Sequence, residues 1–428
     1  LNRGNCRAIF FHSSIQDQIP AMRAGAPSIR IVVCLDRQIG DIPSLEQFIQ
    51  NAPDTDINIH LPDTGVGFQG TTGGTTGAPK ITQGGQSFLT WNMLGFMTAF
   101  QKFDLDNPPV NLAVAPITHA GGMVAMSTLS LGGTVVMMQV AEPGAILKNI
   151  ERHKISLLFL PPTLIYVLMN HPDCPTTDFS SLQYLIAAAA PFAVEKIARA
   201  HEIFGPVICQ SFGQTESGFP LTFISPGAVS EALRDERLRH RLKSVGRPVA
   251  TVGDIQVFDE DGNSLGPDKV GEIVVRGPTV MFRYINDPDA TSAIHKNGWQ
   301  HTGDLGYRDA DGYVYISDRK RDLIISGGFN VFPLEIEQVL VTHSAVQDCA
   351  VIGVPDEKWG EAVKAVIERA PGQDVSEAEL IALCKAQLGS VMAPKSIDFI
   401  AELPRSPVGK VLKKELRAKY WQDREVRI

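Results

Sequence analysis

The stretch LQYLIAAAAPFAVEKIARAHEIFGPVICQ, residues 182–210, decides the fold class. Apolar residues run almost without interruption through Leu182–Ala187 and again through Pro206–Gln210, whereas Glu195–Phe204 mixes charged and apolar residues at helical spacing. We therefore expect a strand, a helix and a second strand. Continuous apolar strands joined by a helix are typical of a parallel sheet that is covered on both faces.

The same alternation extends toward the N-terminus. We expect strands at Asn111–Ile117, Gly133–Val140 and Ile155–Leu160, and a helix at Pro143–Lys154. Ligands of such sheets bind beyond the carboxyl ends of the strands, so the residues that follow these strands are candidates for a site.

The pattern changes after about Gly246. Strand-like segments with short turns follow, namely Asp254–Phe258, Gly271–Arg276 and Gly312–Ile316, which indicates a more antiparallel subdomain. Ser317–Asp322 is a polar break, and about a hundred residues of α+β pattern lie beyond it, which is a common domain size.

We accordingly predict an α/β protein with two domains. Residues 1–320 form a large domain of parallel-type α/β sheets plus a β-rich subdomain, and residues 321–428 form a small, mobile α+β domain. In the small domain, Ser376-Glu-Ala-Glu379 is a capping box that opens a helix.

Composition and charge exclude several classes of protein. Hydrophobic residues make up 44% and charged residues 20%, which leaves no compositional case for extended disorder. The formal charge of −8 argues against a broad nucleic-acid-binding surface. The longest apolar stretch, Ile155–Met169, contains two prolines and is too short for a bilayer span, so we predict no transmembrane helix. The 6 cysteines show no metal-ligand spacing and favour a reducing, cytoplasmic location.

The segment Thr71-Thr-Gly-Gly-Thr-Thr-Gly-Ala-Pro-Lys80 carries the chemistry of a phosphate-binding loop. Glycines let the backbone approach an anion, threonine hydroxyls donate hydrogen bonds and the lysine supplies positive charge. The segment is not a Walker A loop, because Ala78 and Pro79 separate Gly77 from the lysine. The alternative is a flexible Gly/Thr linker, which composition alone favours.

Two later segments each carry a carboxylate near the end, Glu216 in the first and Asp304 in the second. Ser211-Phe-Gly-Gln-Thr-Glu-Ser217 follows a predicted strand, and a carboxylate at a strand end suits Mg²⁺. Trp299-Gln-His-Thr-Gly-Asp-Leu305 presents an aspartate that can accept two hydrogen bonds. The alternatives are a surface turn for the first segment and an Asx turn for the second.

In this order, the three motifs resemble those of the adenylate-forming superfamily of acyl-CoA synthetases, peptide-synthetase adenylation domains and firefly luciferase. The loop of that family reads roughly Thr-Ser-Gly-Thr-Thr-Gly-x-Pro-Lys, and position 73 here is Gly where the family usually has Ser. The departure removes one hydroxyl donor and keeps the flexibility of the loop.

The resemblance assigns roles to residues of the large domain. It implies that Phe212 packs on adenine, that Thr215 contacts phosphate and that Glu216 holds the magnesium of ATP. Asp304 and Arg319 reach the ribose. The full ATP- and AMP-binding set is Thr72, Gly73, Gly74, Thr75, Thr76, Gly77, Lys80, Ala189, Ala190, Pro191, Gln210, Ser211, Phe212, Gly213, Gln214, Thr215, Asp304 and Arg319.

The resemblance also assigns roles to the small domain. Arg321 falls at the hinge about which this domain rotates between half-reactions, although the family usually has Asp or Lys there. Gly327, Gly328 and Phe329 then line a tunnel for coenzyme A; the alternative is a plain β-turn. Lys410, in Pro404-Arg-Ser-Pro-Val-Gly-Lys410, is the expected catalytic lysine, assisted by Thr215 and Glu216.

The acyl pocket is expected to be apolar and free of fixed charge, which favours a fatty or aromatic acid. Peptide-synthetase domains have an aspartate near position 119, whereas this chain has Thr118-His-Ala, which disfavours an amino-acid substrate. His119 shapes or gates the pocket, or is simply a buried, satisfied histidine. The expected acyl-binding residues are His119, Ala120, Gly121, Ala188, Ser211, Gly213 and Gly218.

The sequence therefore predicts an ATP-dependent acyl-CoA ligase that uses ATP, Mg²⁺ and coenzyme A. One alternative is transfer of the acyl group to a carrier protein, and another is a non-catalytic acyl-binding member of the family. Family members carry roughly a further domain's worth of residues before the Gly/Thr loop, so we expect part of the large domain to precede Leu1. The identity of the acid and the oligomeric state stay open, a homodimer included.

Overall fold

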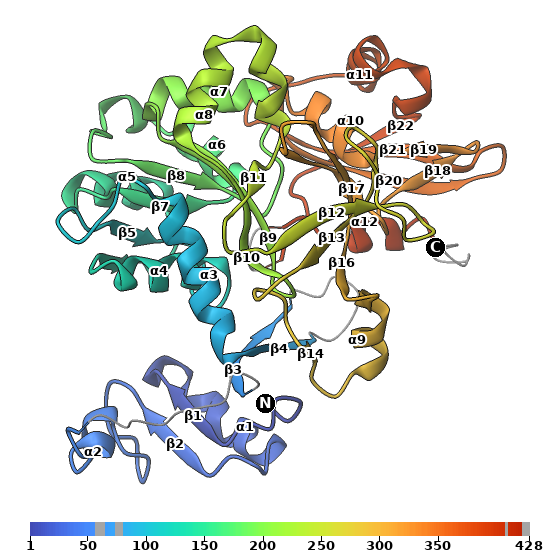
Figure 1. Cartoon of the computed structure of the whole chain (residues 1–428). Helices are drawn as coiled ribbons and strands as arrows, with labels where there is room; N and C mark the ends of the chain where they lie inside the picture. Colours follow the sequence, from blue (N-terminus) through green and yellow to red (C-terminus); the bar gives the residue numbers. More distant parts are fainter. Residues whose placement is uncertain (56–64, 73–79, 407–409, 422–428) are drawn as a thin grey trace.

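The computed structural model describes residues 1–55, 65–72, 80–406 and 410–421 (Figure 1). A seven-stranded sheet in the order β11-β10-β9-β8-β7-β5-β6 forms its centre. Its strands are β5 (Val110–Ala113), β6 (Thr134–Met137), β7 (Leu157–Leu160), β8 (Tyr184–Ala187), β9 (Ile208–Gln214), β10 (Gly218–Ile224) and β11 (Arg247–Pro248). Strands β5 to β9 are parallel, as predicted, whereas β10 and β11 add an antiparallel edge.

Helices cover both faces of this sheet (Figure 1). One face packs against α5 (Pro143–Arg152), α6 (Pro162–Met169), α7 (Val194–Phe204) and α8 (Pro226–Arg234), and the other against α3 (Gln86–Ala99) and α4 (Ala120–Ser130). Because side chains alternate along a strand, neighbours enter different cores. Leu185 faces the first group of helices and Ile186 faces the second. This explains why the strands read as continuous apolar runs.

Several predicted boundaries are wrong for physical reasons. The first two strands are shorter than expected, since β5 stops at Ala113 and residues 114–119 form the loop that leads into α4. Strand β9 is longer than expected because Ser211 and Phe212 pair with the antiparallel strand β10. Ser317–Arg319 is no break, since it continues β17 in pairing with β16.

A second, antiparallel sheet follows, as predicted. It contains β12 (Asp254–Phe258), β13 (Gly271–Arg276), β15 (His295–Lys296), β16 (Trp299–Arg308) and β17 (Val314–Arg319). A three-stranded sheet joins distant segments: β3 (Val66–Thr71), β4 (Ile81–Gly85) and β14 (Arg283–Tyr284), with α9 (Pro288–Ile294) beside it. At the N-terminal end, β1 (Ala8–Phe11) and β2 (Ile31–Cys34) lie with α1 (Ile19–Gly25) and α2 (Leu45–Ile49).

The C-terminal part has its own sheet and core. The sheet contains β18 (Ile324–Ser326), β19 (Phe329–Val331), β20 (Val346–Asp356), β21 (Gly360–Arg369) and β22 (Ser396–Ile400), packed with α10 (Pro333–Leu340), α11 (Glu377–Met392) and α12 (Lys413–Ala418). At the start of α11, the Ser376 hydroxyl accepts a hydrogen bond from the Glu379 N–H at 3.2 Å, as expected of a cap. The Glu379 carboxylate lies 3.3 Å from His343 Nε2.

Residues 320–323 connect β17 of the antiparallel sheet with β18 of the C-terminal sheet. Figure 1 shows the C-terminal part, in orange and red, beside the antiparallel sheet. None of the helices in the described ranges is both long and apolar enough to cross a membrane.

Candidate active site

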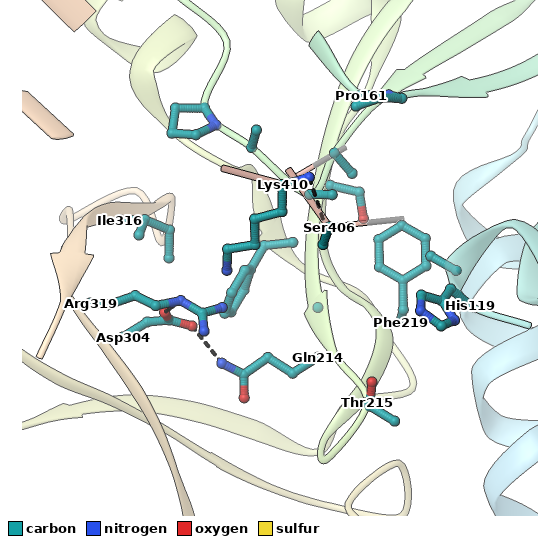
Figure 2. Close-up of a pocket in the computed structure, with 18 of the residues that line it drawn as sticks. His119, Pro161, Gln214, Thr215, Phe219, Asp304, Ile316, Arg319, Ser406 and Lys410 are labelled. Atoms are coloured by element: carbon teal, nitrogen blue, oxygen red, sulfur yellow. Dashed lines mark hydrogen bonds and ion pairs between the residues drawn. The ribbon is translucent and has the colours of Figure 1, made fainter. Parts of the chain in front are cut away.

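A cavity of about 1250 Å³ lies where the large sheet, the antiparallel sheet and the C-terminal part meet (Figure 2). Its walls include the carboxyl ends of β7, β8 and β9, where ligands of parallel sheets bind. From the other side it is lined by Asp304, Arg319 and Lys410. Three separate parts of the chain thus contribute polar groups to one space.

Asp304 is a buried carboxylate of this cavity, with 3% of its surface exposed. Arg319 Nε lies 3.2 Å from Asp304 Oδ1, and Gln214 Nε2 donates to Asp304 Oδ2 at 2.5 Å. Burial raises the pKa of Asp304, while the positive charge of Arg319 acts in the opposite direction. The carboxylate is therefore held in a fixed orientation by groups from β9 and β17.

Lys410 enters the cavity from the C-terminal part, and Figure 2 shows its amine directed toward Arg319 and Asp304. Its backbone is held by Ser406, whose N–H donates to the Lys410 carbonyl at 2.8 Å. Arg405 fixes the same segment to β20 and β21 through Asp348 at 2.8 Å and Glu368 at 3.2 Å. Burial lowers the pKa of Lys410 to about 8, and Arg319 adds to this effect.

Positive charge exceeds negative charge in this part of the cavity. Arg319, Arg321 and Lys410 all act on the pKa of Asp304, and Asp322 is a second carboxylate that acts on Arg321 and Lys410. Burial also lowers the pKa of Arg321, with Arg319 acting in the same direction. Cations crowded together in a partly desolvated space repel one another, and an anion that enters relieves this repulsion. The arrangement is therefore suited to a phosphorylated ligand.

Glu216, in the turn after β9, and Lys80, directly before β4, both contact Tyr284; Glu216 lines the cavity, whereas Lys80 is not among the described residues that line it. Tyr284 donates its hydroxyl to Glu216 Oε1 at 2.7 Å, and Lys80 Nζ lies 4.8 Å from the centre of the Tyr284 ring. Magnesium in nucleotide sites is held by one or two carboxylates together with the phosphates of the substrate. The Glu216 carboxylate could therefore be one ligand of a magnesium ion carried by ATP, and Lys80 is a positive charge that suits the phosphates.

The base of the Gly/Thr loop lies on the β3–β4 hairpin. Its ends are joined because the Thr72 N–H donates to the Lys80 carbonyl at 2.9 Å, and Thr72 lines the cavity. Thr215 also lines the cavity, and its Cγ2 lies 3.2 Å from the position that a Cβ on Gly70 would occupy. The candidates Gly73, Gly74, Thr75, Thr76 and Gly77 lie outside the described residues.

Two expected nucleotide contacts have other partners in the structure. Gln210 Nε2 donates to the Leu242 carbonyl at 3.0 Å and to the Ser244 carbonyl at 3.3 Å, so its amide group holds neighbouring backbone. The Ser211 hydroxyl donates to the Thr222 carbonyl at 2.8 Å within the β9–β10 hairpin. Both residues line the cavity, but these groups stabilise its wall.

The remaining candidates in the large domain line the cavity. Phe212 also packs on the core below the antiparallel sheet, and Gly213 approaches the Gly218 carbonyl so closely that a Cβ would lie 2.6 Å from it. After β8, Ala189 adopts φ +70°, a left-handed conformation that strains a residue with a side chain. Ala188, Ala190 and Pro191 complete this turn.

The apolar end of the cavity lies between α3 and α4. His119 is the N-cap residue of α4, and Ala120 and Gly121 follow it in the cavity wall. Figure 2 shows His119 beside Phe219. The apolar residues here are Phe88, Met123, Met126, Phe159 and Phe219.

Asn92 is a buried polar residue that fixes this wall. Its Oδ1 accepts a hydrogen bond from the Phe219 N–H at 2.7 Å, and its Nδ2 donates to the Phe88 carbonyl at 2.6 Å. Gly218, the neighbouring acyl-binding candidate, has φ +93°, and a Cβ at this position would lie 2.4 Å from Asn92 Oδ1. The site therefore requires glycine at position 218 for two independent reasons.

We expect Gly218→Ala to lower the free energy of unfolding by about 2 kcal/mol, because it combines a left-handed backbone with a displaced asparagine. Chemical denaturation of both proteins measures the change. Gly262→Ala is a matched control, since Gly262 has φ +84° but open space around its Cβ position. If both variants lose the same stability, the contact with Asn92 has no effect.

Hinge candidate Arg321 lines the cavity and directly precedes Asp322, whose carboxylate pairs with Arg417 of α12. Asp318, just before the hinge, accepts a hydrogen bond through Oδ2 from the Leu334 N–H at the start of α10, at 2.9 Å. This contact joins the segments on either side of residue 321. It therefore belongs to the domain arrangement in which Lys410 occupies the cavity.

Gly327, Gly328 and Phe329 are not among the described residues that line the cavity. Both glycines have positive φ, +59° and +82°, and a Cβ on Gly327 would meet the ring of Trp359 at 2.4 Å. Around Gly328 the space is open. In this arrangement the lysine, and not the glycine turn, is at the cavity.

Sequence reasoning missed Tyr284, Asn92 and Glu272. Glu272 accepts a hydrogen bond from the Gly303 N–H at 3.2 Å and lies 3.3 Å from Lys320 Nζ, and so it supports the turn before Asp304. None of the three stands in a motif that pointed to a ligand. Asn92 bonds to Phe219, 127 residues away, Tyr284 to Glu216, 68 residues away, and Glu272 to Gly303, 31 residues away. Only the folded chain brings these pairs together.

The fold and the cavity define a two-part α/β protein with a cavity rich in cations where the parts meet. The chain belongs to the AMP-binding enzyme family: residues 2–285 match the model of the AMP-binding enzyme, and residues 335–410 match that of its C-terminal domain. The predicted adenylate-forming superfamily and the predicted fold class are thereby confirmed.

Three similar proteins illustrate the relationship. A medium/long-chain fatty acid–CoA ligase of Mycobacterium tuberculosis is 38% identical over 370 residues, which cover 84% of this chain and 62% of the relative. A feruloyl-CoA synthase of Amycolatopsis is 36% identical over 366 residues, covering 84% and 72%. The solved structure of an amide bond synthetase from Marinactinospora thermotolerans matches with a TM-score of 0.85 and 30% identity, over 97% of this chain and 80% of that one.

Proposed function

We propose that this protein is an acid–thiol ligase, which converts an apolar carboxylic acid into an acyl-AMP with ATP and then transfers the acyl group to coenzyme A. One observation carries the proposal: Lys410 of the C-terminal part meets the Asp304–Arg319 pair of the large part in a cavity whose other end is apolar. The match to acyl-CoA ligases supports the same reaction class.

In the first half-reaction, an oxygen of the substrate carboxylate forms a bond to the α-phosphorus of ATP, and the bond to pyrophosphate breaks. The carboxylate and the phosphate are both anions, so the protein has to orient them and offset their charge. Lys410 is the group proposed to do this, since its charge enters the cavity from outside the large part. Asp304 and Arg319 are proposed to hold the ribose. Magnesium, held by Glu216, would supply charge neutralisation at the departing phosphates.

In the second half-reaction, the thiol sulfur of coenzyme A attacks the acyl carbon and AMP leaves. The contact between Asp318 and α10 would have to break for the C-terminal part to rotate about Arg321. Rotation would withdraw Lys410 and bring Gly328 to the cavity. We propose that residues 1–320 and residues 321–428 move relative to each other as two units. We also propose that the protein is located in the cytoplasm.

We propose that the apolar end of the cavity determines which carboxylic acids the protein accepts. Phe88, Met126 and Phe159 offer no charge to a second carboxylate, so a fatty or aromatic acid fits this end better than a dicarboxylate. Similarity to an amide bond synthetase favours a second candidate, in which the acyl-AMP passes to an acceptor other than coenzyme A.

Pyrophosphate release from ATP, measured with a panel of fatty and aromatic acids, tests the proposal. Release that depends on the acid and is accelerated by coenzyme A supports the ligase. Acid-dependent release that coenzyme A leaves unchanged, but an amine or a carrier-protein thiol accelerates, supports the second candidate. Absence of release with every acid contradicts both.

We expect the rate of adenylation, measured as kcat/KM for ATP, to fall as the pH rises through about 8. Lys410 has its pKa lowered from 10.5 to about 8, so its ammonium is charged below this pH and neutral above it. The pH dependence of kcat/KM reports the free enzyme. Lys410→Arg keeps its charge to much higher pH, and its residual activity should lack the alkaline decline. An identical decline in both proteins would assign it to another group.

A further inference from the structure

Tyr284 is a buried residue that contacts both Glu216, in the turn after β9, and Lys80, directly before β4. Only 6% of its surface is exposed, although both of its partners are polar. Its hydroxyl donates to the Glu216 carboxylate at 2.7 Å, and its ring face lies 4.8 Å from the Lys80 ammonium. One side chain therefore contacts an anion and a cation through two different parts.

The backbone around Tyr284 is attached to the segments that carry both partners. Strand β14 pairs with β4, which begins directly after Lys80, and the Ile285 N–H donates to the Ile81 carbonyl at 2.8 Å. On the other side, the Met281 N–H donates to the Glu216 carbonyl at 2.8 Å. These bonds fix the position of Tyr284 relative to the β3–β4 hairpin and to the β9 turn at once.

Chemistry gives each contact a defined role. A hydrogen bond to a carboxylate restricts its rotation and occupies one of its lone pairs, which leaves the others for a metal ion. The ring face attracts an ammonium group without neutralising it, so the lysine stays available to a phosphate.

We propose that Tyr284 is a positioning residue that orients the magnesium-binding carboxylate of Glu216 and the phosphate-binding ammonium of Lys80 together. The inference rests on the proposed function, because it assigns both partners to ATP. It adds the claim that metal affinity and nucleotide affinity are set by separate parts of Tyr284. The hydroxyl acts on the metal, and the ring acts on the phosphates.

Equilibrium binding separates the two roles without any turnover. Mn²⁺ binding in the presence of ATP is followed by electron paramagnetic resonance, and ATP binding is measured by calorimetry in EDTA. Tyr284→Phe removes the hydroxyl and keeps the ring, so Mn²⁺ affinity should fall about tenfold while ATP affinity in EDTA changes less than twofold. Tyr284→Leu removes both and should weaken ATP binding in EDTA as well.

Tyr315→Phe is the matched control. Tyr315 is also buried, with 4% exposed, and donates its hydroxyl to the Asp309 carboxylate at 3.0 Å, but it does not line the cavity. This variant should bind Mn²⁺ and ATP like the unaltered protein. Thermal unfolding of Tyr284→Phe and Tyr315→Phe would show whether either variant has lost its fold.

A double-mutant cycle gives a second test of the same inference. In a Glu216→Gln background, Tyr284→Phe should have almost no further effect on Mn²⁺ binding, because the carboxylate that the hydroxyl orients is gone. Equal Mn²⁺ affinity of Tyr284→Phe and the unaltered protein, or additive effects in the cycle, would overturn the inference alone. If the unaltered protein binds no Mn²⁺ with ATP, the proposed function fails and the inference with it.

Discussion

Lys410→Ala is expected to reduce acid-dependent pyrophosphate release about 100- to 1000-fold. A preorganised cation or hydrogen-bond donor aimed at charge that develops in a transition state contributes effects of this size. Lys410 reaches the cavity as a partly desolvated ammonium beside Asp304 and Arg319, and alanine leaves nothing that could replace its charge there. The loss should appear in kcat more than in KM for ATP, since Arg319 and Lys80, which are proposed to bind the nucleotide, are unchanged.

In the second half-reaction, by contrast, Lys410→Ala should have little effect on the rate. When acyl-AMP is supplied together with coenzyme A, Lys410→Ala should form thioester at a rate within about threefold of the unaltered protein, because the proposed domain rotation would withdraw the lysine. The substitution should not destabilise the fold, since burial already disfavours the charged amine. Lys385→Ala, at an exposed position of α11, removes the same charge from the same domain and should change neither half-reaction. An equal loss in both half-reactions would contradict the assigned role.

Local chemistry made much of the fold and site predictable. Apolar runs such as Leu182–Ala187 identify buried strands, because a strand covered on both faces needs no polar alternation. Asp304, Arg319 and Lys410 stand in segments that resemble motifs of known order, and the structure brings all three to one cavity. Their shared location could not be derived from spacing, but the resemblance implied it.

The features that could not be predicted from the sequence depend on contacts between distant segments. Nothing near Asn92 indicates that it binds the backbone of Phe219, 127 residues later. Strand β9 extends through polar residues because β10 turns back along it, which overrides the pattern expected of a loop. The resemblance placed Gln210 among the nucleotide-binding residues, yet its buried amide has two backbone carbonyls as partners. Polar residues in buried positions are therefore the hardest to assign from sequence.

Asp304→Asn is expected to raise the KM for ATP by about tenfold or more and to shift the alkaline decline of kcat/KM to lower pH. Asparagine has the same shape as aspartate but is neutral. It should therefore accept weaker hydrogen bonds from the two ribose hydroxyls, which would weaken the binding of ATP. The pH shift has a separate cause. Asp304 raises the pKa of Lys410 against the lowering effect of burial and of Arg319, so its removal must lower that pKa further below about 8.

Two measurements check this prediction, the KM for ATP at pH 7 and the pH profile of kcat/KM. Asp309→Asn is the control, since Asp309 follows β16 at the same sheet but bonds Tyr315 away from the cavity. A higher KM with an unchanged profile would mean that Asp304 binds ribose without acting on Lys410. A shift toward higher pH would contradict the sign of the interaction itself, because removal of a neighbouring anion cannot stabilise an ammonium ion.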